Sequence, residues 1–251
     1  MPLIDTTPGT PAASGSDQQP QPNSELASNF AHPALSPLEL STKSSVWGDT
    51  SGSAIEPADG DWGHGPARRA VLQQHHNRCM FCGLQSIANE VHNRNDNHRD
   101  VQPDNLNVAD SICHRWQHLG EIGQGNGLLV YLPNLAPHDV SHLLRTVLVA
   151  LLSGEESTRN DGRRLLNWMA SHHQYVEDAW GSSDPSVFAT AITRTAQEDR
   201  SRRALAFEHL ALVLSPEALD SAARQWATEV NAKWPVTLWS RVHHDVMNAP
   251  T

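Results

Sequence analysis

Two short stretches decide the fold: residues 79–83 are Cys-Met-Phe-Cys-Gly, and residues 110–114 are Asp-Ser-Ile-Cys-His. A Cys-x2-Cys pair on a turn is half of a zinc site, and Gly83 allows the backbone to fold back toward the ion. The chain has one further cysteine, which follows an aspartate by three positions. The spacing therefore predicts a structural zinc with four ligands: Cys79, Cys82, Asp110 and Cys113.

The fourth ligand is the least determined part of this site. A carboxylate is a less common zinc ligand than a thiolate. His114, His118 and a water molecule are the alternatives to Asp110, and His114 would point away from Cys113 if both lie on one helix. The three cysteines could also be ordinary buried thiols.

A lone Cys-x2-Cys also occurs in redox proteins of the thioredoxin type, where it opens a helix after a strand. Here a helix is predicted before the pair, over residues 68–78, and no βαβ pattern follows it. The sequence therefore favours a metal site over a redox dithiol.

Composition excludes several classes of protein. The 251 residues include 18 basic and 28 acidic side chains, a formal charge of −10 that disfavours a protein coating DNA. Three cysteines are too few for a disulfide scaffold, and 15 histidines favour metal binding in a reducing compartment. No apolar run reaches the about 18 residues that a membrane span needs, so no membrane insertion is expected, and no secretory leader is recognised.

The chain is predicted to have three parts. Residues 1–64 are rich in Pro, Ser and Gln and are expected to be a disordered tail, in which Leu38-Glu39-Leu40 is more easily explained as linker than as a docking motif. Residues 65–135 should form the zinc domain, and residues 136–248 a helical extension. In the zinc domain we expect strands at 87–92 and 128–132, and a helix to about residue 119 that Asp110 or Ser111 caps.

The part after Pro137 shows helical periodicity of its apolar residues. One predicted helix covers residues 201–214, and Asp184-Pro185 begins another. This part also holds more tryptophans than a bundle of its size needs for its core, which favours a partner surface. They are Trp168, Trp180, Trp226, Trp234 and Trp239.

The order of motifs resembles the HNH endonuclease family, through Glu90-Val91-His92-Asn93, then Asn105-Leu106, then Cys113-His114. The resemblance implies an α+β fold, with an HNH-like ββα core, an attached zinc ribbon and an all-helical C-terminal part. It matches His92 and His114 to ligands of the catalytic metal, and Asn105 to an orienting asparagine. It also places Asp110 where the family has a zinc cysteine.

Asn93 occupies the position of the general base in that resemblance. An asparagine amide cannot accept a proton from water, and losing a general base typically costs 10²–10⁴-fold in rate. His98 could in principle replace it but lies five positions later, in a polar loop. The resemblance therefore implies a retained zinc site and a damaged catalytic site.

A narrower resemblance runs from about residue 66 to residue 200. Cys-x2-Cys-Gly, Glu-Val-His-Asn, Cys-His-x3-His-Leu-Gly, Val130-Tyr-Leu-Pro133 and His142-Leu-Leu-Arg145 follow in the order of the IcmJ/DotN family of bacterial type IVB (Dot/Icm) secretion systems. This resemblance implies a non-enzymatic adaptor that binds the coupling ATPase. It would work in the bacterial cytoplasm, recruited to the secretion complex of the inner membrane.

Three functions follow from these observations. The first is a secretion adaptor on an inactive nuclease fold, with a structural zinc and no nucleic-acid partner. The second is a metal-dependent HNH endonuclease that cleaves DNA. The third is a zinc-stabilised DNA-binding module, which the acidic charge disfavours, as does the lack of an Arg/Lys cluster.

Overall fold

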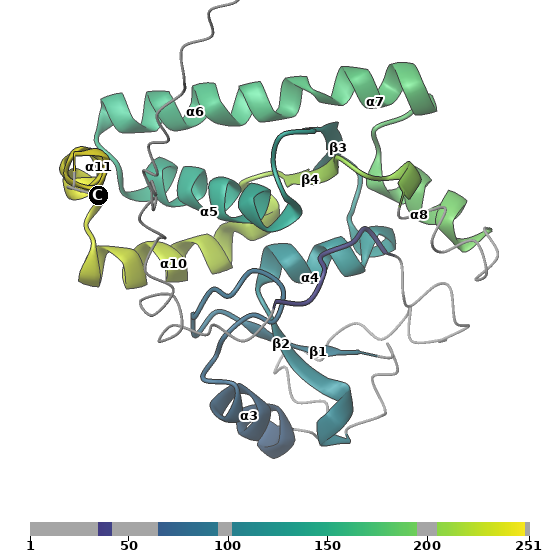
Figure 1. Ribbon diagram of the computed structural model, residues 1–251, viewed down its shortest axis with the longest axis horizontal. Helices are drawn as coiled ribbons and strands as arrows, with labels where there is room; N and C mark the ends of the chain where they lie inside the picture. The colour runs from purple at the N-terminus through teal and green to yellow at the C-terminus, as the bar shows by residue number, and fades with distance from the viewer. Residues whose placement is uncertain (1–34, 42–64, 95–101, 195–204, 249–251) are drawn as a thin grey trace, which may run out of the picture. The chain divides into compact units, whose positions relative to one another are not determined.

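The computed structural model describes residues 35–41, 65–94, 102–194 and 205–248. These residues form a mixed α/β structure in which helices predominate over two small antiparallel sheets (Figure 1). The predicted loop residue His98 lies outside the described ranges.

The first part of the fold surrounds the cysteine turn. Helix α3 (Gly65–Gln74) precedes the turn, strands β1 (Glu90–Asn93) and β2 (Leu106–Ala109) form an antiparallel pair, and helix α4 (Ser111–Gln117) follows directly. The strands pair with Val91 opposite Val108. The Met80 N–H donates to the Val108 carbonyl at 2.8 Å, which fixes the cysteine turn to this sheet.

Helix α4 begins where its cap was predicted. The Asp110 carboxylate accepts hydrogen bonds from the N–H groups of Ile112 and Cys113, at 3.1 and 3.4 Å. These are two of the donors that the first turn of a helix leaves without intrahelical partners. The cap aligns Cys113 with the cysteine turn and orients the rest of the helix.

The second sheet corrects the prediction of an all-helical C-terminal part. Strand β3 (Gly127–Tyr131) is confirmed near its predicted position, but it pairs with β4 (Leu210–Leu214), in the segment predicted to be a helix. All five β4 residues are buried, so the run Leu-Ala-Leu-Val-Leu has no polar face to distinguish a strand from a helix. The pairing joins residues on both sides of the expected domain boundary at 135.

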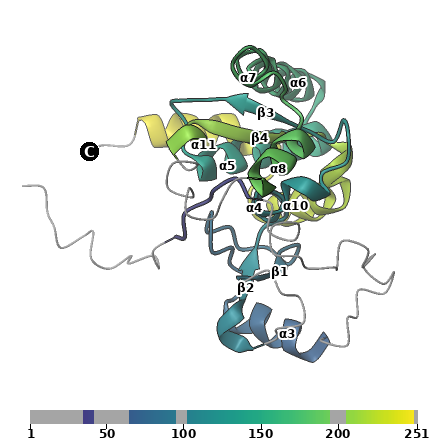
Figure 2. The same ribbon diagram turned by 90° about the vertical axis from the view of Figure 1, so that its right-hand side faces the viewer.

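The helices after residue 136 pack around this sheet. Helix α5 (Pro137–Ser153) contacts α6 (Glu156–Ser171), α10 (Asp220–Lys233) and β4, while α7 (His173–Trp180) contacts β3. Figures 1 and 2 show α6 and α7 on the side of α5 away from α3 and the β1–β2 pair. Short helices complete this part: α8 (Pro185–Thr193), α11 (Trp239–Met247), and the 3₁₀ turns η6 (Glu217–Leu219) and η7 (Val236–Leu238). Two further 3₁₀ turns, η3 (Pro103–Asn105) and η4 (Leu119–Glu121), lie in the first part of the fold.

One hydrophobic core connects the cysteine turn to the helices. It includes Cys79, Cys82 and Cys113 together with Trp116 of α4 and Leu144 of α5, all of them buried. Because the cysteines are part of this core, any group bound to them would be enclosed by the cysteine turn on one side and by the helices on the other.

Residues 35–41 also belong to the folded unit, although they lie in the predicted tail. Leu38 and Leu40 are buried, and their side chains join the main core. The expectation of disorder is therefore wrong for this segment, whereas residues 1–34 and 42–64 lie outside the described residues. No helix in the described ranges is both long and apolar enough to span a membrane.

Candidate metal centre

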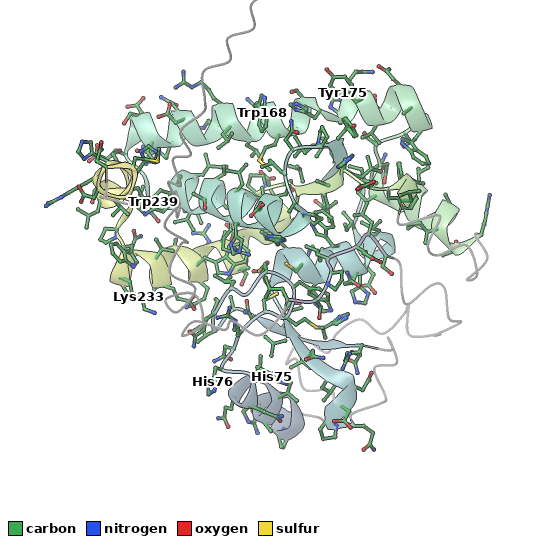
Figure 3. All side chains as sticks on the ribbon, viewed as in Figure 1. His75, His76, Trp168, Tyr175, Lys233 and Trp239 are labelled. Atoms are coloured by element: carbon green, nitrogen blue, oxygen red, sulfur yellow. The ribbon has the colours of Figure 1, made fainter. Side chains whose placement is uncertain are left out.

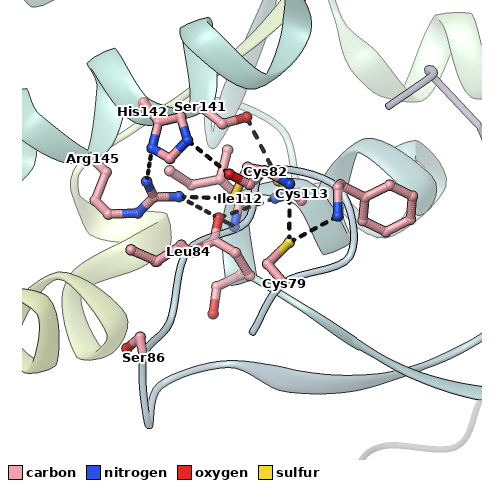
Figure 4. A network of polar contacts seen from close by, with 12 residues as sticks. Cys79, Cys82, Leu84, Ser86, Ile112, Cys113, Ser141, His142 and Arg145 are labelled. Atoms are coloured by element: carbon pink, nitrogen blue, oxygen red, sulfur yellow. Dashed lines mark hydrogen bonds and ion pairs between the residues drawn. The ribbon is translucent and has the colours of Figure 1, made fainter. Parts of the chain in front are cut away.

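Three cysteines meet where the cysteine turn faces the start of α4. The sulfur atoms of Cys79, Cys82 and Cys113 all lie within 4.8 Å of one another, and all three residues are buried (Figure 4). The structure thus brings together residues that are more than 30 positions apart, as the spacing predicted. Three sulfurs at such separations can bind one metal ion.

The turn itself favours negative charge on Cys79. The N–H groups of Phe81 and Cys82 donate to the Cys79 sulfur at 3.4 and 3.5 Å, and Gly83 adopts a positive φ of 76° that closes the turn. Hydrogen bonds from Cys113 and Cys82 lower the pKa of Cys79 to about 3. Donating that bond raises the pKa of Cys113. Three buried thiols at these separations could lose their protons to a divalent cation and hold it.

Asp110 lies beside the sulfurs but is bound to a residue that the sequence did not predict. Its Oδ1 atom accepts a hydrogen bond from Arg145 of α5 at 2.9 Å, in a pair that is almost fully buried. Arg145 also lies 3.7 Å from the Cys82 sulfur, 2.9 Å from Nδ1 of His142, and 5.2 Å from the ring centre of Trp226. The Arg145 guanidinium therefore connects the cysteine turn, α4, α5 and α10.

The Asp110 carboxylate does not belong to the group of donor atoms that the three sulfurs form. Its Oδ1 is used by Arg145 and by the helix cap, whereas its buried Oδ2 has no hydrogen-bond partner among the described residues. Burial raises the pKa of Asp110, despite the opposing charge of Arg145. A buried acceptor without a partner is costly unless something pairs with it, but neither carboxylate oxygen lies within the group of sulfur donors, so Asp110 as fourth ligand stays a prediction.

A second cluster lies on the same helix and consists of histidines. Ligand atoms of His92, His114 and His118 all lie within 4.8 Å of one another. His92 comes from β1, His114 lies on α4, and His118 is the residue directly after the last turn of that helix. The ring centres of His114 and His118 are 4.7 Å apart, and that of His92 is 5.3 Å from His114. Three imidazoles in this arrangement could hold one metal ion through three nitrogens.

Glu90 fixes one of these rings. Its Oε2 lies 2.6 Å from Nδ1 of His114, and its Oε1 accepts a hydrogen bond from Ser111 at 2.5 Å. Burial alone would raise the pKa of Glu90, but the hydrogen bond and charge of His114 and the Ser111 hydroxyl lower it to about 2. A carboxylate on Nδ1 leaves Nε2 of His114 available for a metal, which is the usual outer-shell arrangement of metal-binding histidines.

The remaining predicted site residues lie at the end of β1 and directly before β2. Asn93, at the base position of the resemblance, ends β1 and pairs with Leu106. Asn105 is buried at the end of η3, where its carbonyl accepts from the Arg94 N–H at 2.8 Å. Their roles stay predictions.

His118 was predicted only as an alternative zinc ligand, and no role was predicted for Glu90 or Arg145. The i, i+4 spacing of His118 from His114 was the sequence signal that could have placed both residues in one cluster.

The fold and its sites define a mixed α/β protein with two separate three-donor clusters around one short helix. No family model matches the chain. It is similar to the type 4 apparatus protein DotN of Legionella pneumophila, with 23% identity over 163 residues that cover 62% of this chain and 76% of that protein. This similarity supports a distant relationship to DotN.

Proposed function

We propose that this chain is a non-catalytic, zinc-stabilised adaptor of a type IVB secretion coupling complex, and that it binds the coupling ATPase. The observation that carries the proposal is the similarity to DotN, which extends over 62% of the chain. The adaptor would act in the bacterial cytoplasm and be recruited to the complex at the inner membrane.

The three buried thiols support a structural role for the metal. Zinc would be held by Cys79, Cys82 and Cys113, with Oδ2 of Asp110 as fourth ligand, and it would neutralise charge that the core cannot otherwise accommodate. Because Arg145 attaches the same centre to α5 and α10, metal binding and packing of the helices would stabilise each other.

The position of Asn93 supports the absence of catalysis. It follows His92 directly on a strand, so their side chains point to opposite faces of the β1–β2 pair. An amide there cannot generate hydroxide from a metal-bound water, whatever metal the histidines hold.

Exposed aromatic residues support a protein partner. Trp168, Trp180 and Trp234 are about half exposed, whereas Trp226 proves to be a core residue. Figure 3 shows Trp168 and Tyr175 along the outer edge formed by α6 and α7. Large exposed aromatic side chains are common anchors of interfaces.

The test of the adaptor role is a binding measurement with the cytoplasmic part of the coupling ATPase from the same organism. We expect a stable complex on gel filtration that survives moderate salt, because apolar burial rather than exposed charge would hold it. The variant Trp168→Ala/Tyr175→Ala should weaken this complex. The control is Trp226→Phe, which changes a core residue and should leave binding unchanged. Lack of any complex, with folded proteins on both sides, would contradict the proposal.

The histidine cluster favours one other function, a metal-dependent DNA endonuclease. Three imidazoles oriented by Glu90 would bind a divalent ion, which would act as a Lewis acid on a phosphodiester. Plasmid cleavage assayed with Mg²⁺, Mn²⁺ and Ni²⁺ decides between the two functions. We expect no cleavage by the native chain. Cleavage that His92→Ala abolishes would replace the adaptor proposal with the nuclease, whereas cleavage only after Asn93→His would support the damaged site.

A further inference from the structure

Residues 35–41 lie extended in a groove between α4 and the segments that follow β3 and precede β4, at one end of the β3–β4 pair. The purple segment in Figure 1 crosses α4, and its side chains alternate in burial: Leu38 and Leu40 are buried, while Pro37 and Glu39 are exposed. This alternation is that of a strand laid on a surface. The groove is lined by Trp116 and Gln117 of α4, by residues 133–137, and by residues 207–210.

The groove binds this segment largely through its backbone. Ser36 N–H donates to the Met80 carbonyl at 2.9 Å, Ser41 N–H donates to the Trp116 carbonyl at 2.8 Å, and Leu119 N–H donates to the Ser41 carbonyl at 3.0 Å. The Gln117 amide donates to the Glu39 carbonyl at 2.8 Å. Any extended peptide could make these bonds, so the two leucines supply the selectivity.

The segment fills the groove incompletely. A cavity of about 560 Å³ remains beside it, and Leu38 and Leu40 form part of the cavity wall. Two buried leucines and four hydrogen bonds favour docking, whereas ordering seven residues opposes it by a free energy of similar size. The segment is therefore held weakly enough to leave, and a longer or bulkier segment could fill the space better.

We propose that this groove is a docking site for an extended segment of a partner protein with leucine-like residues at alternate positions, and that residues 35–41 are its built-in competitor. The 23 residues from 42 to 64 join the competitor to α3, so its effective concentration at the groove is high. A second copy of the chain would offer the same sequence at a lower concentration, so a different sequence is the expected occupant. The proposal does not depend on the secretion assignment.

The test uses the full chain with Leu38→Asp and Leu40→Asp, and a fluorescent peptide of residues 33–43 as probe. Fluorescence anisotropy should show binding to this variant at least about ten-fold tighter than to the native chain, whose own segment competes. The same peptide carrying both aspartates is the matched control and should not bind. Equal affinity for both chains, or binding to neither, would overturn the proposal.

A measurement on the native chain guards against a variant that does not fold. The Ser41 and Leu119 amides should exchange with deuterium about 100-fold faster than the Val213 amide of β4, which pairs with Leu128 in the ladder, since local release of the segment exposes them. Exchange as slow as that of Val213 would show a permanent part of the core and overturn the proposal. A native dimer in light scattering that Leu38→Asp/Leu40→Asp dissociates would also overturn it, because the occupant would then be a second copy.

Discussion

The two donor clusters differ in what surrounds them more than in what they contain. Each has three ligands and each uses α4, but the thiols are enclosed by α5 through Arg145 and Ser141, whereas the histidines are supported by Glu90 within the same ββα segment. The side chains of His114 and Glu90 keep 21% and 35% of their surface exposed, although His92 and His118 are buried like the three cysteines. An enclosed site coupled to distant helices suits a permanent structural ion, and a partly exposed one suits an exchangeable ligand.

The largest effect should come from breaking the thiol cluster. Cys82→Ser should lose the zinc, expected at about one per chain, and with it cooperative unfolding, because the ion supplies much of the folding free energy of this region. Elemental analysis and thermal unfolding followed by circular dichroism measure both. The matched change in the other cluster, His92→Ala, should keep the zinc content. Soluble native protein purified without chelator and free of zinc would contradict the structural role.

Removing Arg145 should come next. Arg145→Met leaves the Asp110 carboxylate buried without its partner, which should lower the free energy of unfolding by about 3–5 kcal/mol. Urea unfolding measures it. The control is Arg224→Met, which breaks an exposed ion pair with Asp220 and should leave the midpoint of urea unfolding unchanged. Equal effects of the two single variants would show that Arg145 does not support the thiol centre.

A smaller effect is expected when the histidine cluster loses its supporting carboxylate. Glu90→Gln should weaken binding of Ni²⁺ or Co²⁺ to this site by about 10–100-fold, because a neutral amide is a weaker acceptor for His114 than the carboxylate that orients the ring. Isothermal titration calorimetry on zinc-loaded protein gives the affinity. Glu121→Gln is the control, since that carboxylate lies 3.7 Å from His118 and is mainly exposed. If the metal affinity of the Glu90→Gln variant equals that of the native chain, the metal does not depend on His114 as a ligand.

The smallest effect concerns the fourth ligand of the zinc ion that the thiol cluster would bind. Asp110→Cys should keep about one zinc per chain, because a thiolate replaces the carboxylate, while Asp110→Ala should bind it more weakly. X-ray absorption should count three sulfurs and one oxygen or nitrogen in the native chain and four sulfurs in the Asp110→Cys variant. The same number of sulfur ligands in the native chain and in the Asp110→Cys variant would exclude Asp110 as the position of the fourth ligand.

The thiol cluster and the cap of α4 were predictable from spacing, because both are local rules applied to short motifs. The strand β4 was not, since Leu210–Leu214 is apolar at every position and its identity depends on β3, which lies far away in the sequence. Arg145 was also beyond prediction, because an arginine in a helix is normally solvated and only the fold shows it against Asp110. The alternation Leu38-Glu39-Leu40 was visible, but a groove to receive it was not.

The pairing of β3 with β4 has a consequence for synthesis of the chain. Leu129 lies opposite Leu212, roughly eighty positions later, so β3 leaves the ribosome several seconds before its partner at about 5–20 residues per second. During that interval an apolar strand edge is unprotected, while the segment carrying the cysteines and histidines is already complete. A chain that stops before residue 210 would keep this edge permanently, which makes it a template for aggregation and a substrate for chaperones.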